Sequence, residues 1–379
     1  MHPKSSRNVK YSLKYRSQMI GTQNTNFNVK YRPANYYANG NNLTYFSAAS
    51  SFSALCPYTV VTMTVAGHPS RNETDFNGIL LAPAPWKLKA RMWHFLVSPL
   101  KANTVNGKSN AVFPAGWAAP FQAEPLAEGE FVTGHPGVIM LVQYTDTPVG
   151  PYDELIYIAG KFSMHKEPDS NETNKAETGF RITRIYVSTK ESAANGRRNW
   201  TIAKELAEFK YTRHSDGSWD LAVFPSNPLI SETLETPAEV RRPNIPFFHI
   251  SIHPIPILGS LCIPINFNIL GSYFRLLDPP IPNGPPGSSP ALVKSNTNSD
   301  GSIKEPKWAS LVPGIKGKMR LVTYKPKVDV GSDLEGEDGR KRKAHLAIAD
   351  GVNFPAVVPW KMGACLEGVD IHFDAPEWL

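Results

Sequence analysis

Short apolar runs, some alternating with polar residues and some nearly continuous, dominate the chain from Trp86 onward. They are rich in Val, Ile, Phe and Tyr and end at Pro, Gly or Asp, which is typical of antiparallel strands. We expect strands at 92–100, 137–144, 154–162, 180–189, 219–225, 247–253, 318–325 and 369–373. The pattern therefore predicts a mainly β fold of the α+β type with few helices.

One stretch, residues 201–209, has the spacing of a short helix. Its apolar residues recur at i, i+4 and i+7 from Ile202, and Thr201 is a suitable N-cap. On such a helix Lys204 lies about 200° from Ile202 and is placed to pair with Glu208 at i+4. The spacing alone predicts an exposed lysine.

Residues 1–62 differ from the rest in composition: they hold seven basic residues and no acidic one, and they lack a periodic apolar pattern. We expect a poorly ordered extension, which is either part of the natural protein or precedes a start at Met63. A transit peptide is a further alternative, although no amphipathic helix stands out. Residues 63–379 are expected to form a single domain. Loop insertions are expected at 165–179, 278–302 and 331–344.

The formal net charge of +7 arises entirely within residues 1–62, because 33 basic residues face 33 acidic ones in the remainder. We therefore expect no nucleic-acid partner. The most apolar stretch is interrupted by Pro256 and Pro264, so we expect no membrane-spanning helix.

The cysteines, Cys56, Cys262 and Cys365, lie far apart and form no CxxC pair. Neither a disulfide framework nor a metal site is indicated, and a cytoplasmic location fits best. The chain also lacks GxxxxGK[ST], GxSxG and HExxH motifs, and no GxGxxG follows a strand. The sequence signals for nucleotide binding, serine hydrolysis and zinc proteolysis are therefore missing.

His249, Ser251 and His253 alternate with apolar residues along a predicted strand and so share one face. At about 3.3 Å per residue the two histidines stand about 13 Å apart, too far to bind one metal ion. The stripe either lines a pocket or faces water, and we carry its three residues as substrate-binding candidates.

Four segments, in the same order along the chain, resemble the acetoacetate decarboxylase superfamily, and most closely its fungal branch. They are APWKLKARMWHF (84–95), TPVGPYDELIYIAG (147–160), RITRIYVSTKESAANGRRNW (181–200) and IAKELAEF (202–209). The resemblance covers about residues 78–275 well. It implies a cone-shaped antiparallel β-barrel with a few short helices around an enclosed apolar pocket, no cofactor, and assembly as a homo-oligomer.

In that family a lysine forms a Schiff base with a ketone, and the protonated imine is the electron sink for decarboxylation. Carried over by the resemblance, this nucleophile falls on Lys204, the arginine that holds the substrate carboxylate on Arg91, and an acid on Glu154. An arginine suits its role because its planar fork binds a carboxylate with two hydrogen bonds. The aromatic candidates for the pocket wall are Trp86, Tyr152 and Trp200.

The chain departs from the family at three positions. Glu205 stands where the family has a second lysine, Ala203 replaces a proline, and Ile139 replaces a second acid. A neighbouring cation lowers the pKa of a lysine, whereas a neighbouring carboxylate raises it if the two groups are close. Glu205 therefore bears on whether Lys204 is nucleophilic.

Three functions follow as alternatives. The first is an imine-forming lyase of fungal secondary metabolism that decarboxylates, cleaves by aldol chemistry or dehydrates a keto compound other than acetoacetate. The second is a non-covalent cyclase or pericyclase, of the Diels-Alderase type, in which Lys204, Arg91 or Glu154 polarises a carbonyl of a small hydrophobic substrate. The third is a carrier of lipophilic ligands. The retained residues favour the first, and the lost lysine pair favours the second.

Overall fold

The computed structural model describes residues 38–39, 42–43, 73–75, 77–100, 113–164, 177–226, 245–257, 259, 261–293, 307–330 and 345–379. The chain divides into two units, Met1–Pro69 and Ser70–Leu379. In the first, the described part is an antiparallel pair, β1 (Ala38–Asn39) and β2 (Asn42–Leu43). The rest of the 1–62 extension and the 331–344 insertion lie outside the described residues.

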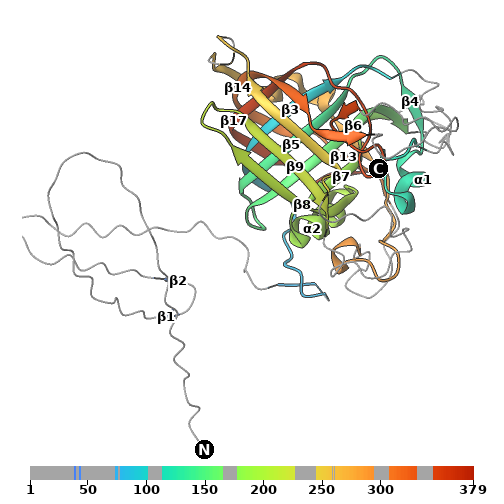
Figure 1. Ribbon diagram of the computed structural model, residues 1–379. Helices are drawn as coiled ribbons and strands as arrows, with labels where there is room; N and C mark the ends of the chain where they lie inside the picture. Colours follow the sequence, from blue (N-terminus) through green and yellow to red (C-terminus); the bar gives the residue numbers. More distant parts are fainter. Residues whose placement is uncertain are drawn as a thin grey trace, which may run out of the picture. The chain divides into compact units, whose positions relative to one another are not determined.

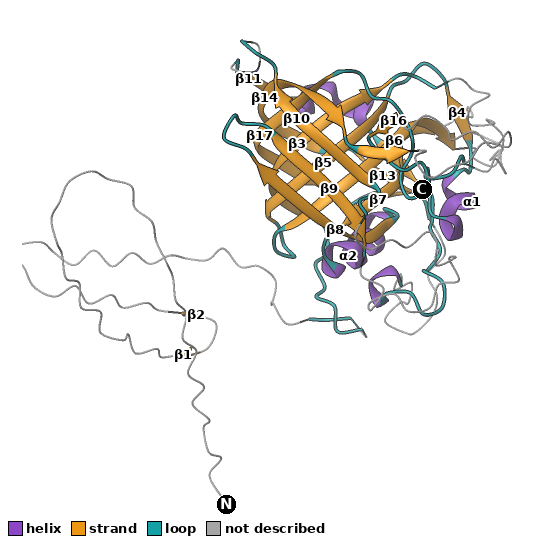
Figure 2. Cartoon of the chain, viewed as in Figure 1, coloured by secondary structure: helices purple, strands orange, loops and turns teal. Residues whose placement is uncertain are grey.

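The second unit consists mainly of strands (Figures 1 and 2). Each predicted strand is present, although the bounds differ by several residues. They are β3 (Trp86–Val97), β5 (Gly137–Asp146), β6 (Tyr152–Met164), β7 (Glu177–Val187), β9 (Trp219–Pro225), β10 (Phe248–Pro254), β14 (Gly314–Pro326) and β17 (Met362–Phe373).

Together with β8 (Lys204–Arg213), these strands close into a ring in the order β7, β8, β9, β10, β14, β17, β3, β5, β6 and back to β7. Neighbours in the ring are antiparallel, except that β7 and β8 run parallel. The mainly β fold and the closed ring of strands that the sequence and the resemblance implied are therefore confirmed.

Shorter elements extend and cover the ring. Strand β4 (Glu130–Val132) lies beside β6, and β11 (Ile263–Asn266) lies beside β14. The sheet also extends from β7 through β12 (Leu276–Asp278), β13 (Ala309–Leu311) and β18 (Glu377–Trp378). Strands β15 (Val328–Val330) and β16 (His345–Ala347) form a separate pair. The helices are α1 (Ala123–Leu126) and α2 (Lys190–Trp200), with 3-10 segments η2 (Pro120–Gln122), η6 (Phe267–Phe274) and η7 (Pro290–Leu292). Within the described ranges, no helix is both long and apolar enough to cross a membrane.

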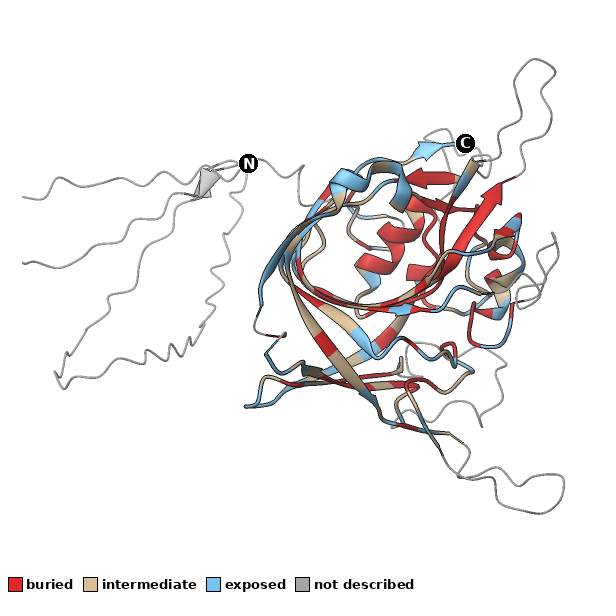
Figure 3. Cartoon of the chain, turned by 90° about the horizontal axis from the view of Figure 1, so that it is seen from above, coloured by how far each residue is buried: buried red, intermediate tan, exposed pale blue. Residues whose placement is uncertain are grey.

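Buried, half-buried and exposed residues all occur along the ring (Figure 3): β6 and β7 are buried along most of their length, whereas β8 and β14 are largely half-buried or exposed. Trp93 of β3 contacts Trp219 of β9 with ring centroids 5.4 Å apart, and since these strands are not neighbours in the ring, the contact crosses its interior. Met92, which points the other way, belongs to a second core cluster with Ile156 and Ile371. The curved wall of β3, β5, β6, β7 and β17 thus separates two apolar cores.

The predicted helix at 201–209 is wrong. Helix α2 ends at Trp200, where Thr201 adopts the left-handed conformation (φ 54°) and serves as the C-cap, and β8 begins at Lys204. Two residues at i and i+4, such as Ile202 and Leu206, share a face in a strand as well as in a helix, so their spacing did not discriminate. Pairing of this segment with β7 and β9 decides for the strand.

The helix itself lies upstream, and its start has a recognisable signal. Thr189 is the N-cap, and its side chain accepts a hydrogen bond from the backbone N–H of Ser192. Glu191 lies in the first turn, where a negative charge is favoured by the helix dipole. The N-cap signal at Thr189 therefore marks the true helix, whereas the apolar spacing at 201–209 predicted a helix in a segment that forms a strand.

The 278–302 insertion is not a free surface loop in its described part, which extends to residue 293. It begins with Asp278 in β12 and contains η7, and Ile281, Ala291 and Leu292 are buried. Of the 165–179 insertion, residues 177–179 belong to β7, and residues 165–176 lie outside the described residues.

Candidate active site

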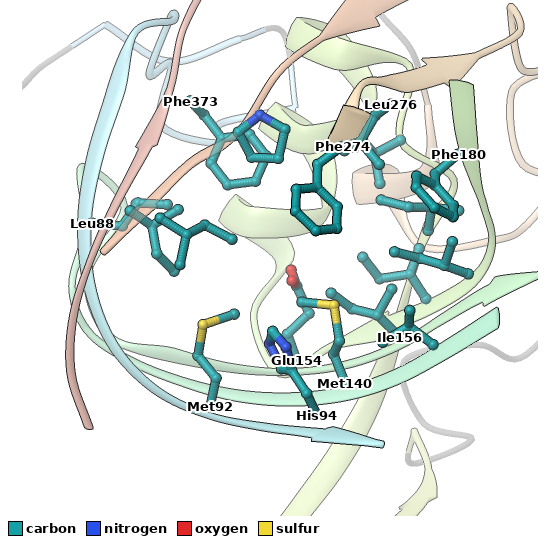
Figure 4. Close-up of a pocket in the computed structure, with 18 of the residues that line it drawn as sticks. Leu88, Met92, His94, Met140, Glu154, Ile156, Phe180, Phe274, Leu276 and Phe373 are labelled. Carbon is teal, nitrogen blue, oxygen red and sulfur yellow. The ribbon is translucent and has the colours of Figure 1, made fainter. Parts of the chain in front are cut away.

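An apolar cavity of about 230 Å³ lies on the face of β3, β5, β6 and β7 that is turned away from the ring interior. Most of its wall consists of aliphatic and aromatic side chains from these strands, from β17, from η6 and from the end of α2. In Figure 4, Phe274 and Phe373 lie across the cavity from Met92 and Met140. The polar side chains of the described wall are His94, Tyr144, Tyr152, Glu154 and Lys204.

Lys204 and Glu154 form a buried ion pair in this wall. The Nζ atom of Lys204 lies 2.7 Å from Oε2 of Glu154, and the two side chains are 5% and 4% exposed. Lys204 pairs with Ile185 of β7, and Glu154 pairs with Val187 of the same strand. The two charged side chains therefore meet above β7, which separates their strands.

Neighbouring polar groups complete the pair. The Nζ of Lys204 donates to Oγ of Ser192 (3.2 Å) and lies 5.1 Å from the centroid of the Tyr152 ring. The hydroxyl of Tyr144 donates to Oε1 of Glu154 (3.2 Å). Such partners offset part of the cost of removing two charges from water.

The charge state of the lysine follows from these contacts. Burial lowers the pKa of Lys204, but the charge of Glu154 and the hydrogen bonds of the lysine outweigh burial, so this pKa is raised. Burial raises the pKa of Tyr144 and brings that of Tyr152 to about 12. At neutral pH, Lys204 is an ammonium ion and both tyrosines carry their protons.

Gly196 of α2 makes room for the lysine side chain. A Cβ atom at this position would lie 2.6 Å from Cδ and 2.8 Å from Cε of Lys204. Side chains never approach so closely, and a larger residue at 196 would displace the lysine. Close packing against the Lys204 side chain therefore explains why residue 196, directly before Arg197 and Arg198, is a glycine.

Glu205 does not face Lys204, because successive residues of a strand point to opposite faces. Its carboxylate lies 3.2 Å from a guanidinium nitrogen of Arg184 and accepts a hydrogen bond from Gln122 (3.4 Å). Burial raises the pKa of Glu205, against the effect of Arg184 and Arg197. The carboxylate that sets the charge of Lys204 is that of Glu154, fifty positions away along the chain.

Ala203 and Ile139, the other two departures from the family pattern, pack in the core inside the ring of strands.

The structure brings together Lys204, Glu154 and the three aromatic candidates Trp86, Tyr152 and Trp200, all of which line the cavity. It does not bring Arg91 there. Its neighbour Met92 faces the cavity, whereas Arg91 borders a second cleft of about 640 Å³, which shares Tyr144 and Tyr152 with the cavity. The guanidinium of Arg91 lies 5.0 Å from the ring centroid of Trp219. The carboxylate anchor that the resemblance implied is therefore absent from the described wall beside Lys204.

The stripe on β10 also lies away from the cavity. Oγ of Ser251 is 3.2 Å from Nε2 of His253, which agrees with the shared face that alternation predicts, but neither these residues nor His249 line the cavity. The histidine that does line it is His94, which is not among the residues predicted from the sequence. The sequence contained a signal for His94: it lies eight positions after Trp86 on the same strand, and residues an even number of positions apart in a strand share a face.

No family model matches the chain, and a search of curated proteins also found no match. Among solved structures, an acetoacetate decarboxylase from Legionella pneumophila aligns over 86% of this chain and 98% of its own, with a TM-score of 0.42 and 10% identity. An enduracididine biosynthesis enzyme with HEPES buffer bound aligns over 83% and 98%, with a TM-score of 0.39 and 11% identity. An acetoacetate decarboxylase-like enzyme from Sphingomonas wittichii aligns over 79% and 94%, with a TM-score of 0.40 and 8% identity.

Proposed function

We propose that the protein is an enzyme that binds a small hydrophobic carbonyl compound in the cavity and forms an imine with Lys204. The observation that carries this proposal is the ion pair of Lys204 and Glu154, 2.7 Å apart and buried in an otherwise apolar wall. A buried ion pair adds little to stability compared with apolar residues of similar size. Buried, strongly interacting titratable groups in a cavity are typical of reactive sites.

Transfer of one proton within the pair makes both groups reactive. Glu154 takes a proton from the ammonium of Lys204, and the neutral amine attacks the carbonyl carbon of the substrate. The new C–N bond forms as the C=O π electrons move to oxygen, and a proton moves from the nitrogen to that oxygen to give a carbinolamine. The protonated Glu154 then returns its proton to the departing hydroxyl group, which leaves as water. The products are an iminium ion on Lys204 and a carboxylate on Glu154, so the charges of the original pair are restored.

The wall favours a neutral substrate. In its described part Lys204 is the one cationic side chain, because Arg91 lies elsewhere and burial lowers the pKa of His94 to about 4. A keto acid would therefore find no separate anchor for its carboxylate. Aldol or retro-aldol cleavage and dehydration of a keto compound fit better than decarboxylation, and a cavity of about 230 Å³ suits a substrate larger than acetoacetate, such as a fungal secondary metabolite.

One observation supports a second candidate, the non-covalent cyclase. The raised pKa of Lys204 keeps the amine protonated in the resting state, and an ammonium group can polarise a carbonyl by hydrogen bonding without attacking it. This reading uses the same cavity and the same lysine, and differs in that no covalent bond forms.

Borohydride trapping separates the candidates. The protein is incubated with a panel of apolar ketones and aldehydes, reduced, and searched for added mass by peptide mapping. We expect a reduced adduct on Lys204 that is absent from Lys204→Ala. A matched control is Lys161→Arg, since Lys161 is also buried, contacts the Phe180 ring of the cavity wall, and has a pKa lowered by burial.

An adduct on Lys161, or on many lysines equally, would contradict the proposal. Binding without an adduct, but with conversion of a polyene carbonyl compound, would favour the cyclase. If the ligand binds and is released unchanged, the remaining alternative is that the protein is a carrier of lipophilic ligands.

A further inference from the structure

We infer that His94 is a second recognition point in the cavity, which hydrogen-bonds a neutral oxygen of the substrate at a distance from the reacting carbonyl. This inference rests on the proposed function and deepens it, because it specifies the substrate class: an extended apolar carbonyl compound that carries a hydroxyl or a second carbonyl group.

The polar groups of the wall are used unequally. Tyr144 donates to Glu154, and Lys204 binds both Glu154 and Ser192. The indole N–H groups of the wall are used as well, that of Trp86 by the carbonyl of Ala82 and that of Trp200 by Asp374. Among the described residues, Nε2 of His94 has no hydrogen-bond partner although it is buried.

An unpartnered nitrogen in apolar surroundings costs free energy, and proteins generally avoid one. A leucine at this position would line the wall at no such cost. The imidazole therefore calls for a partner that the described part of the chain does not supply, and it stands in the wall of a ligand-sized cavity.

The charge state of His94 restricts that partner. Burial lowers its pKa to about 4, so the ring is neutral at physiological pH. A neutral imidazole offers one donor and one acceptor, and it binds a hydroxyl or carbonyl group better than a carboxylate, which needs a cation once it leaves water.

The position of His94 sets the spacing. It pairs with Met140 across β3 and β5, whereas Glu154 pairs with Val142 across β5 and β6. Two strand spacings and one two-residue step thus separate His94 from Glu154, roughly 12 Å between Cα atoms. In Figure 4, His94, Met140 and Glu154 rise from the same wall, and Met140 pairs with His94 on β3 and with Ile156 on β6. A substrate that reaches both polar points has an apolar segment between its two oxygens.

The test uses a medium-chain methyl ketone and its isomers with one hydroxyl group at successive chain positions. Binding is measured by calorimetry to the protein, to His94→Leu and to the conservative His94→Gln. Each is also prepared in a Lys204→Met background, where no imine forms. Met140→Leu is the control for a change of wall shape.

We expect one hydroxylated isomer to bind on the order of tenfold more tightly than the parent ketone, the ratio that a well-made buried hydrogen bond provides. His94→Leu should lose this preference without losing affinity for the parent ketone, and His94→Gln should retain part of it. Since His94→Leu removes an unpartnered nitrogen, it is expected to fold at least as stably as the original protein.

The inference is overturned if no isomer is preferred, if the preference survives in His94→Leu, or if none of the ketones binds. The Lys204→Met background separates it from the proposed function. In that background, a preference that depends on His94 supports the inference whether or not an imine forms. If the same preference is found but the protein that retains Lys204 gives no trapped adduct, the inference stands and the imine mechanism is refuted.

Discussion

The carboxylate of Glu154 and the ammonium of Lys204 lie 2.7 Å apart, although fifty positions separate the residues in sequence. The sharp end of α2 at Thr201 returns the chain directly into β8, so the lysine follows the helix by only a few residues. Ser192 and Gly196 of that helix contact the lysine side chain from one direction, and Glu154 contacts it from another. The lysine side chain is thereby packed between the helix and β6 in the cavity wall.

The interaction free energy between Lys204 and Glu154 can be measured by a double-mutant cycle. Lys204→Met leaves Glu154 buried without a counter-charge and should lower the free energy of unfolding by about 3–5 kcal/mol. The double variant Lys204→Met/Glu154→Gln should be less destabilised than the sum of the single variants, by on the order of 2 kcal/mol. Urea denaturation of the four proteins checks this. Additive effects would show that the two groups do not interact in solution.

Gly196→Ala should reverse the usual effect of this substitution in a helix. Alanine normally stabilises a helix by about 1 kcal/mol relative to glycine. Here the new Cβ would lie 2.6 Å from Cδ of Lys204, so we expect the lysine side chain to shift and its contact with Glu154 to weaken. We expect a loss of stability of about 1–3 kcal/mol from overpacking, measured by urea denaturation, and a slower rate of adduct trapping.

The matched control is Gly196→Ala combined with Lys204→Ala. Shortening the lysine removes the atoms that the new Cβ meets, so in that background Gly196→Ala should be neutral or stabilising. If it destabilises both backgrounds equally, the glycine serves the helix backbone and not the lysine.

Features set by residues close together in the sequence could be predicted from it, whereas contacts between residues far apart in the sequence could not. Alternation is local and fixed by strand geometry, so the strands around Trp93 and Ile250 were predictable from their own residues. The site was not, because the neighbour of Lys204 in sequence, Glu205, points to the opposite face, while its true partner comes from β6. The resemblance supplied Lys204 and Glu154, but it also supplied Arg91, which the alternation of β3 turns away from the cavity.

A further prediction concerns the pH dependence of stability. Burial raises the pKa of Asp278 to about 7, against the effects of Arg181 and the backbone N–H of Ile182. The folded state therefore binds this proton between about pH 4 and pH 7, where the unfolded state has released it. Stability should fall as the pH rises through this window, by on the order of 4 kcal/mol from this group.

Asp278→Asn should remove that part of the slope and be more stable than the original protein at pH 8, as measured by urea denaturation across the pH range. Asp370→Asn is the control, since Asp370 is exposed, and its pKa is lowered by an ion pair with Lys89. It should leave the slope between pH 5 and pH 7 unchanged. An equal slope in Asp278→Asn would mean that the carboxyl is ionised in the folded protein at neutral pH.

The last prediction tests which carboxylate controls Lys204. Reductive methylation with formaldehyde reports the fraction of neutral amine, so the pH midpoint of Lys204 modification, followed by peptide mapping, gives the pKa of this lysine without any natural substrate. Glu154→Gln removes the charge that raises this pKa and leaves burial, which lowers it. The midpoint should move down by at least about one pH unit, which corresponds to about 1.4 kcal/mol.

Glu205→Gln is the matched control, because it makes the same change one residue from Lys204 in sequence but on the opposite face of β8, beside Arg184. It should leave the midpoint where it was. The reverse result, a shift in Glu205→Gln and none in Glu154→Gln, would mean that β8 does not present Lys204 to β6. An imine mechanism that uses Glu154 as the proton carrier would then have lost its basis, since the carboxyl must lie within hydrogen-bonding distance of the amine whose proton it accepts.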